Sequence, residues 1–475
     1  MDDTALSIIT EYAITSFTFL IYPVLAIYAA IHAVLYKRDA QAAAAWVGLI
    51  LLAPFAGVLL YWLLGINRAR SRALKVFNQN IKARSRPSES EQDTSPLLRL
   101  IGKVSFTYPI REGNEITPLI NGEQAYPEML KAIRNAKSTL VLCTYIFDND
   151  STGKKFAKAI KDAASRGVQC KIIIDAVGAR YSFPTILGSL KVKNVDARKF
   201  HSVLRPWGFR YAQLRNHRKL MVVDGETGFF GGMNIRHSHL VKEANSRELT
   251  QDIHFKATGP ILKDLMNVFE SDWHFTTKEV LGEAWRPKTL PTGKMAARVL
   301  PNGPDEKFDQ LRWILLGAVG SAEKSIAVHS PYFVPDDTLI SALSVAALKG
   351  VLVDIIIPRH NNHKLVQWAS LACMPQLLRT GCRVWLGGST FDHSKILIID
   401  GRWCMIGSSN WDARSFRLNF EINVDSTDKD LCDELKTIFD EKLASATRLS
   451  KECLKKQGQL IRLRNSCARL LGPYL

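Results

Sequence analysis

The feature that most constrains the fold is a motif that occurs twice in the chain. Each copy reads H-x-K-x4-D-x6-G-[GS]-x-N, and the copies begin at His217 and His393. Ahead of each copy, residues 163–175 and 346–358 both show the end of a helix, a glycine and then an apolar, β-branched run. Identical spacing at corresponding places of a repeat argues strongly against coincidence. The sequence therefore predicts two similar halves that alternate helices with short strands, as α/β domains do.

The residue types in the motif suit chemistry on a phosphodiester. The His and Lys of each copy are two positions apart on a predicted strand, so both side chains leave the same face. Attack on a phosphodiester needs a nucleophile, positive groups around the phosphate oxygens and an acid for the leaving alkoxide. Two His–Lys pairs that face each other supply all three with no metal and no other cofactor. A single histidine on a strand is more often structural, but the duplication favours catalysis.

The repeated motif and its surroundings provide the candidate site residues. The candidate catalytic residues are the motif positions His217, Lys219, Asp224, His393, Lys395 and Asp400. We expect the two aspartates to anchor strand ends, which is an architectural role. Asp252 and Glu421 each follow the motif of their own half in a strand-like run, and both are candidates to orient a histidine as triad carboxylates do. The alternative for both is an ordinary carboxylate on a solvated face.

One further carboxylate stands next to the second motif. Asp392 directly precedes His393. A nearby carboxylate raises the basicity of a histidine, so Asp392 either tunes His393 or is simply solvated.

The N-terminal part predicts a membrane anchor. Residues 13–35 and 42–64 each run for 23 positions without Asp, Glu, Lys or Arg, which is long enough for a transmembrane helix. The short link between them predicts a hairpin, and seven Lys and Arg residues within 68–86 point its ends to the cytoplasm. Lys37 and Arg38 in the link work against this orientation. A cleaved signal peptide and a buried core hairpin are the alternatives.

The net charge and the cysteine content limit the classes of binding partner and of cysteine site that we expect. The net charge of +18 indicates an anionic partner, and phospholipid headgroups and nucleic acid fit this equally well. No aromatic-rich basic stripe that would stack bases is evident, so we expect no nucleic acid partner. The eight cysteines have no spacing typical of metal sites or disulfide frameworks. Reduced thiols fit a cytoplasmic catalytic part.

On the basis of these residues, the chain resembles the phospholipase D superfamily from residue 13 to its C-terminus. Finer features, including the segments 214–219, 330–335 and 414–421, are similar to bacterial cardiolipin synthases. The resemblance implies two α/β/α sandwich halves that share one site, where one histidine becomes phosphorylated and the other acts as acid and base.

Carried over by motif position, the resemblance gives each site residue a role. His217 would be the nucleophile and His393 the acid and base, although the two roles can be exchanged. The phosphate would be held by Lys219, Lys395, Asn234, Asn410 and Ser408. Gly232 stands where the second half has Ser408, so one side of that cradle lacks a hydroxyl.

The expected organisation follows from these features. It comprises a two-helix anchor at 1–75, a linker at 76–118, phospholipase D-like domains at 119–290 and 291–447, and a basic C-terminal helix at 448–475. That last segment either lies on an anionic membrane surface or packs on the domain.

The resemblance implies a multi-pass enzyme of the cytoplasmic membrane that transfers a phosphatidyl group between two phosphatidylglycerol molecules and releases glycerol. The alternatives are a hydrolase, a transferase with another acceptor alcohol and, from another class, a membrane-bound nuclease.

Overall fold

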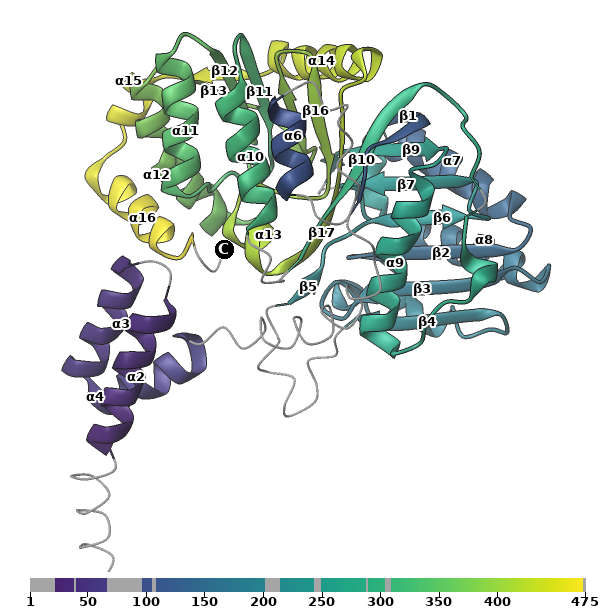
Figure 1. Ribbon diagram of the computed structural model, residues 1–475, viewed down its shortest axis with the longest axis horizontal. Coiled ribbons are helices and arrows are strands. Elements are labelled where there is room, and N and C mark those ends of the chain that lie inside the picture. The colour runs from purple at the N-terminus through teal and green to yellow at the C-terminus, as the bar shows by residue number, and fades with distance from the viewer. Residues whose placement is uncertain are drawn as a thin grey trace, which may run out of the picture. The chain divides into compact units, whose positions relative to one another are not determined.

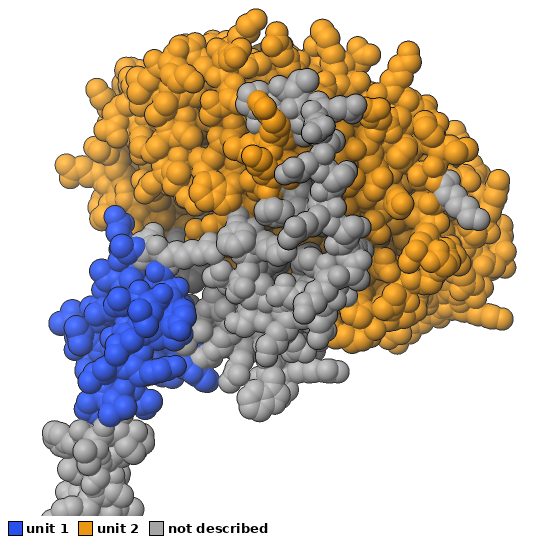
Figure 2. All heavy atoms as spheres, in the orientation of Figure 1, with its two compact units in different colours: residues 1–72 blue, residues 73–475 orange. Residues whose placement is uncertain are grey.

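The protein was analysed as a computed structural model, which describes residues 22–37, 40–65, 96–104, 108–200, 214–242, 249–287, 289–303 and 309–472. The chain divides into two compact units, residues 1–72 and 73–475, shown in different colours in Figure 2. Each unit is described by itself.

The described residues of the first unit form short apolar helices. They are α2 (Tyr22–Tyr36), α3 (Ala40–Leu52), α4 (Pro54–Leu60) and the π-helical turn η2 (Tyr61–Gly65). The second predicted span, 42–64, is therefore not one continuous helix. The helix breaks at Ala53 because the following Pro54 disfavours a helical conformation in the residue before it and has no N–H to donate.

The described part of the first unit does not test the whole anchor. Among the residues that the structure describes, no helix is both long and apolar enough to cross a membrane. Residues 13–21 of the first predicted span and the basic positions between 68 and 86 lie outside the described residues.

The second unit contains two halves with matching element order (Figure 1). The first half comprises β1 (Arg111–Ile120), α7 (Asn121–Asn135), β2 (Thr139–Thr144), α8 (Ser151–Ser165), β3 (Gln169–Asp175), β4 (Val195–Phe200), β5 (Arg215–Asn216), β6 (Leu220–Val223), β7 (Thr227–Gly231), β8 (Thr250–Gln251), β9 (Ile253–Thr258) and α9 (Leu262–Thr277). Short 3-10 turns lie at η3 (Gly178–Arg180), η4 (Ile186–Gly188), η6 (His237–His239) and η7 (Glu283–Trp285).

The second half repeats this order with two additional helices. It comprises β10 (Met295–Asn302), α10 (Gln310–Ser321), β11 (Ser325–His329), α11 (Asp337–Leu348), β12 (Leu352–Ile357), α12 (Lys364–Arg379), β13 (Arg383–Leu386), β14 (Phe391–Asp392), β15 (Ile396–Ile399), β16 (Trp403–Gly407), α13 (Ala413–Arg417), β17 (Asn419–Ser426), α14 (Lys429–Ala444) and β18 (Thr447–Leu449).

Within the described residues most strands of both halves join into one sheet, and β8 and β14 form a separate two-stranded sheet. The order of the large sheet is β18-β13-β12-β11-β15-β16-β17-β10-β1-β9-β7-β6-β2-β3-β4. The antiparallel pair β1–β10 lies at the junction, and the strand order on one side of it mirrors the order on the other. The predicted internal repeat is thus visible as a pseudo-twofold arrangement of two α/β halves.

Helices cover both faces of the sheet because the strands are apolar on both faces. In the first half, α7 and α8 pack against Leu140 and Leu142 of β2, and α9 packs against the alternate residues Val141 and Cys143. The second half is layered in the same way, with α10, α11 and α12 on one face and α14 on the other. Strands buried on both faces read as continuous apolar runs, which is what the sequence contains.

A glycine ends the corresponding helix in each half. Gly167 follows α8 with φ +102°, and Gly350 follows α11 with φ +93°. A backbone in this region favours glycine, so both helices stop here and the chain turns into β3 and β12. The predicted sequence of helix, glycine and strand is confirmed in both halves.

Two segments at the borders of the predicted domains are structured. The range 76–118, expected to be a linker, contains α6 (Pro96–Val104), which packs on the second half through Leu97 and Ile101, and the first part of β1. At the C-terminus, α15 (Lys451–Lys455) and α16 (Gln459–Leu470) follow β18.

The C-terminal helix α16 packs on the catalytic unit. Asn465 and Ala468 are buried, and Arg464 lies over the ring of Trp368 in α12 at 4.4 Å. Leu460 and Leu470 are about four-fifths exposed (82% and 78%). The alternative in which this helix packs on the domain is therefore what the structure describes, with an apolar face directed outward.

Candidate active site

Each half contributes a two-residue strand that pairs with the other half. β5 runs parallel to the start of β17, and β14 runs parallel to β8. The motif histidines continue these crossings, because His217 N donates to Phe420 O at 2.9 Å and His393 N donates to Gln251 O at 2.7 Å. The prediction that His and Lys share one strand is therefore wrong. The H-x-K residues connect a strand that pairs with the other half to a strand, β6 or β15, of their own half.

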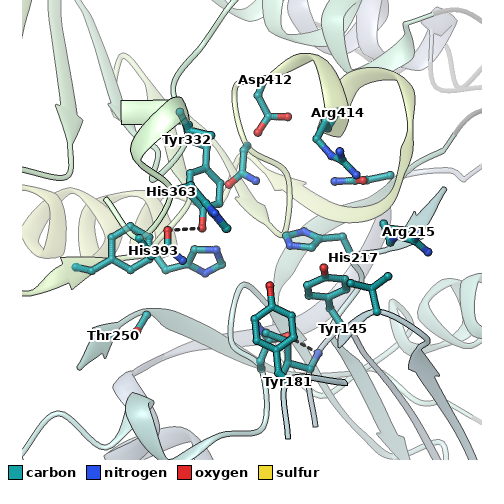
Figure 3. A pocket seen from close by; sticks show the side chains of 18 of the residues that line it. Tyr145, Tyr181, Arg215, His217, Thr250, Tyr332, His363, His393, Asp412 and Arg414 are labelled. Atoms are coloured by element: carbon teal, nitrogen blue, oxygen red, sulfur yellow. Dashed lines mark hydrogen bonds between the residues drawn. The ribbon is translucent and has the colours of Figure 1, made fainter. Parts of the chain in front are cut away.

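The two motif histidines face each other across one cavity (Figure 3). Their ring centroids are 6.5 Å apart and the ring planes are inclined by 75°. Both rings line a cavity of about 570 Å³, with Tyr145 5.1 Å from His217 and Tyr332 5.8 Å from His393 between ring centroids. Two reacting contacts of about 3 to 3.5 Å each span a comparable distance. One phosphorus atom therefore fits within reach of both rings.

A buried carboxylate from the opposite half holds each histidine. His217 Nδ1 lies 3.1 Å from Glu421 Oε2, and His393 Nδ1 lies 2.8 Å from Asp252 Oδ2. Both predicted orienting residues thus contact a histidine, but the expected pairing within one half is wrong. The pairing crosses because β5 and β14 carry each histidine onto the strand of the other half. With Nδ1 engaged, Nε2 of each ring is left as the atom for chemistry.

The two carboxylates have different surroundings. Glu421 also accepts hydrogen bonds from Ser408 Oγ at 2.5 Å, Ser415 Oγ at 3.1 Å and Asn419 Nδ2 at 3.1 Å. Burial alone would raise the pKa of Glu421, but His217, Lys219 and Ser408 lower it to about 2. Glu421 is therefore ionised beside His217.

Asp252 lacks an equivalent set of side-chain hydrogen-bond donors. Its side chain accepts from Ile253 N at 2.8 Å, and Gly232 stands at the position of Ser408. Burial raises the pKa of Asp252. A Cβ atom at Gly232 would lie 2.6 Å from Asp252 Oδ1, so the glycine is what lets this carboxylate approach. The hydroxyl of Ser408 thus serves Glu421, which corrects its expected role as a phosphate ligand.

Burial lowers the pKa of both histidines, with different compensation. For His217 the charge of Glu421 opposes the effect of burial. For His393, burial and the nearby charges of Lys395 and Lys219 hold the pKa well below its usual value. The environment of His217 consequently tolerates a proton better than that of His393.

Each motif lysine lies beside the backbone of its own histidine. Lys219 Nζ donates to His217 O at 2.6 Å, and Lys395 Nζ donates to His393 O at 2.5 Å. Burial lowers the pKa of Lys219 to about 7 and that of Lys395 to about 8. Each contact uses one of the three ammonium hydrogens.

The motif asparagines come from the loops after β7 and β16 and line the cavity. Asn234 Oδ1 accepts from Ile146 N at 3.0 Å, which aims its amide group. Asn410 N donates to Ser415 Oγ at 3.1 Å, next to the hydrogen-bond donors of Glu421. The Asn234 side-chain amide is thus oriented by the backbone, whereas the contact of Asn410 is made by its backbone N–H.

The motif aspartates lie away from the cavity and tie strand ends together. Asp224 accepts hydrogen bonds from the backbone N–H groups of residues 137–139, and Asp400 from those of residues 323–325. Both have positive φ, +52° and +55°, in a tight turn after the strand. Their expected architectural role agrees with these contacts.

Asp392 is neither solvated nor a simple tuner of His393. It is buried and accepts from Ser394 Oγ at 2.6 Å and from Lys442 Nζ at 2.5 Å. Against the effect of burial, Lys442 and His329 hold its pKa well below its usual value. Its charge is therefore directed mainly to Lys442, and the pKa of His393 is lowered, not raised.

Several cavity residues were not singled out from the sequence. They are Tyr145, Tyr181, Arg215, Arg236, Tyr332, His363, Asp412 and Arg414. Arg215 lies two positions before the first histidine, and Arg414 four positions after Asn410, so motif spacing offered a signal for these two. Burial raises the pKa of Asp412 to about 6. In the part of the chain that the structure describes, no cluster of three or more His, Cys, Asp or Glu residues could hold a metal ion.

Comparisons with known proteins give consistent matches over both halves. The family model "Cardiolipin synthase, PLD-like domain" matches residues 129–273 and 315–443, and the model "Phospholipase_D-nuclease N-terminal" matches residues 24–65. The probable cardiolipin synthase YwiE of Bacillus subtilis is 30% identical over 93% of this chain and 90% of its own length. Cardiolipin synthase A of Pseudomonas entomophila is 30% identical over 95% and 96%. The phosphatidylserine synthase structure from Haemophilus influenzae has a TM-score of 0.59, 15% identity and coverage of 80% of this chain and 100% of its own, which shows a shared fold.

Proposed function

This chain belongs to the cardiolipin synthase family of phospholipase D-like phosphatidyltransferases, and on that premise we propose that it joins two phosphatidylglycerol molecules through a phosphohistidine intermediate and releases glycerol. The observation that carries the proposal is the pair of imidazoles facing one cavity 6.5 Å apart, each held at Nδ1 by a buried carboxylate. A nucleophile and an acid on opposite sides of one phosphorus atom are what such a transfer requires.

The reaction has two steps. In the first, His393 Nε2 bonds to the phosphorus of the donor lipid, the bond from phosphorus to the glycerol oxygen breaks, and His217 gives its proton to that oxygen. In the second, a terminal hydroxyl of the acceptor phosphatidylglycerol gives its proton to His217, its oxygen bonds to phosphorus, and the phosphorus–nitrogen bond breaks. The proton is returned, and the product is cardiolipin.

This assignment exchanges the two histidine roles that were carried over from the resemblance. Its support is the contrast between the carboxylates, because groups whose environments push their pKa values apart separate into acid and nucleophile. The ionised Glu421, with a pKa of about 2, stabilises a proton on His217. His393, whose pKa is held well below the usual value, presents a neutral ring for attack.

Positive and amide groups complete the phosphate site. Asn234 and Asn410 line the cavity, and Lys219 and Lys395 are buried beside the histidines; all four serve in this proposal as donors for the phosphate oxygens in both steps. Such fixed donors act on the charge that develops in the transition state.

Lipid substrates would account for the exposed apolar side chains of the first unit. Its described helices expose large apolar side chains such as Ile27, Leu52 and Phe55, which fits contact with lipid. We propose that residues 13–35 and 42–64 hold the enzyme in the cytoplasmic membrane as a hairpin, with the catalytic unit on the cytoplasmic side. Phosphatidylglycerol would then reach the cavity from the bilayer.

Product analysis with defined lipids tests the reaction. Wild-type enzyme incubated with phosphatidylglycerol is expected to form cardiolipin and glycerol in equal amounts. Formation of phosphatidic acid and glycerol without cardiolipin would make the chain a hydrolase and overturn the proposal.

A substrate with a good leaving group tests the histidine roles. A p-nitrophenyl phosphodiester needs little proton donation, so His217→Ala is expected to release about one equivalent of p-nitrophenolate and then stall as the phosphoenzyme. His393→Ala is expected to release none. A burst in His393→Ala and none in His217→Ala would restore the carried-over roles.

A further inference from the structure

The C-terminal helix α16 carries apolar side chains on its outer side. They recur every three or four residues and are all exposed; they are Leu460, Leu463, Cys467 and Leu470, which we call the apolar stripe. The opposite side of the helix is buried, and Ala468 there belongs to the core of the second half. The side that packs on the domain is thus distinct from the side that carries the stripe.

Basic side chains accompany the stripe and indicate its partner. Residues 451–472 contain six Lys or Arg residues and one acidic residue, Glu452. Arg464 lies over Trp368 and Arg469 pairs with Asp337, so these two hold the helix on the catalytic unit. The other four are exposed: Lys451, Lys455, Lys456 and Arg462. A dry protein interface would bury such cations at a cost, whereas the headgroups of an anionic bilayer bind them beside inserted apolar side chains.

The helix lies next to an opening of the active-site cavity. It packs along α12 (Figure 1), and the first residues of α12, 364–366, line the cavity. Leu365 among them is 45% exposed, so the cavity opens at this end of α12. At the end of α16, a Cβ atom on Gly472 would lie 3.7 Å from Val334, two positions after the cavity residue Tyr332. The helix therefore borders the wall that α12 and the Tyr332 segment form.

We propose that α16 docks the catalytic unit on an anionic membrane surface. The apolar stripe enters the headgroup region, the exposed cations bind lipid phosphates, and the adjacent opening of the cavity comes to lie at the bilayer. This contact is additional to the apolar helices of residues 22–65. The inference rests on the proposed function in that a lipid is what the cavity takes from this surface.

A fluorescent label on the stripe tests the contact in the full-length enzyme. The structure describes all eight cysteines, and of these Cys453 and Cys467 are exposed and the rest buried, so Cys453→Ser directs a thiol-reactive nitrobenzoxadiazole to the stripe. The enzyme is reconstituted in phosphatidylcholine vesicles with or without phosphatidic acid, an anionic lipid that has no headgroup alcohol to release. Quenching by nitroxides on the acyl chains reports immersion of the label. Each Lys or Arg at an anionic surface strengthens binding by roughly fivefold, so we expect strong quenching with phosphatidic acid and weak quenching without it.

A second labelled position provides the matched control. Helix α14 covers the face of the sheet opposite to α12, and Thr437 is exposed on it. Thr437→Cys, in a chain with Cys453→Ser and Cys467→Ser, carries the same label. Its quenching is expected to be the same with and without phosphatidic acid, because this side of the unit does not meet the membrane.

Replacing two leucines of the stripe is expected to abolish the docking. Leu460→Gln with Leu470→Gln leaves the buried side of α16 intact, and each leucine contributes roughly tenfold to partition into an apolar phase. Quenching at Cys467 should fall to the level at Thr437. The rate of cardiolipin formation in phosphatidylglycerol vesicles, divided by the rate of the same preparation in detergent micelles, should fall by roughly tenfold. Leu348→Gln, at a leucine that is 70% exposed at the far end of α11, should keep both readouts within about twofold.

The quenching and the rate ratio decide the inference. Quenching at Cys467 that requires phosphatidic acid and is lost in the double leucine variant supports it. Four results overturn it: quenching no stronger than at Thr437, quenching independent of phosphatidic acid, an unchanged rate ratio in the double variant, or a Cys467 that resists labelling because another protein surface covers it. Supportive quenching in an enzyme that forms no cardiolipin defeats the proposed function and leaves the docking surface established.

Discussion

Replacing Glu421 by glutamine separates the roles of the two histidines. The carboxylate is fully buried and its Oε2 lies 3.1 Å from His217 Nδ1. At an effective dielectric constant of about 20, opposite unit charges at this separation attract by about 5 kcal/mol. The glutamine oxygen keeps a dipolar contact, so we expect about half of this to be lost, which corresponds to a roughly hundredfold change in the protonation equilibrium of His217.

The expected result is a shift of the alkaline limb of the pH profile to lower pH. In the proposed mechanism His217 acts as an acid in the first step, and its acid form exists only below its pKa. Burial lowers that pKa and Glu421 opposes the effect, so removing the charge takes the acid form away at pH values where the wild type retains it. The measurement is kcat/KM for glycerol release from phosphatidylglycerol between about pH 4 and pH 9.

The matched control makes the same change at the symmetry-related carboxylate. Asp252→Asn loosens the contact of 2.8 Å to His393, and we expect a lower rate with the alkaline limb in place, because a nucleophile works in its neutral form. If the alkaline limb of the pH profile moves in Asp252→Asn and stays in place in Glu421→Gln, the assignment of His217 as the acid and His393 as the nucleophile is refuted.

Two further predictions concern residues that position the site. Asp224→Ala should lower the free energy of unfolding by about 2 to 4 kcal/mol, because three backbone N–H groups lose their acceptor and alanine is strained at φ +52°. Burial would raise the pKa of Asp224, but these N–H groups lower it below 3.8. The stabilisation by Asp224 is thus present above pH 3.8 and is lost as the pH falls through the lowered pKa. Denaturant unfolding of the wild type and of Asp224→Ala at several pH values would show this loss or contradict it. Gly232→Ala places a Cβ atom 2.6 Å from Asp252 Oδ1. The release of p-nitrophenolate should therefore slow by about tenfold to a hundredfold, with little change in the alkaline limb of the pH profile. An unaltered rate of release would show that the Asp252 contact does not position His393.

Local pattern was enough to predict the architecture of the catalytic unit. The repeat predicted two α/β halves, and Gly167 and Gly350 predicted where corresponding helices end, because a left-handed backbone has a residue signature. Asp224 and Asp400 were expected at strand ends, where they are found. Pro54 carries a local signal for the break in the second apolar span, which apolar length alone does not reveal.

The cross-pairing of the histidines could not be predicted in this way. It depends on β5, β8 and β14, which are two residues long and too short to show a period. Their partners lie in the other half, so the contact between His217 and Glu421 spans 204 residues of sequence. Sequence reasoning placed each carboxylate with the motif of its own half because only local spacing was visible. The hydrogen bond from the Ser408 hydroxyl to Glu421 could not be predicted for the same reason.

The departures from symmetry all act on one side of the site. Ser408 in place of Gly232 supports an ionised Glu421 and hence a proton on His217. Arg215 in place of Phe391, and Arg414 in place of Ser238, add positive charge to the same side. A symmetric pair of histidines would have no preferred direction for entry of the acceptor. Because β5 and β14 make each half depend on the other, changes within either half can bias the shared cavity, and in the proposed mechanism the change at Ser408 favours the His217 side for proton transfer.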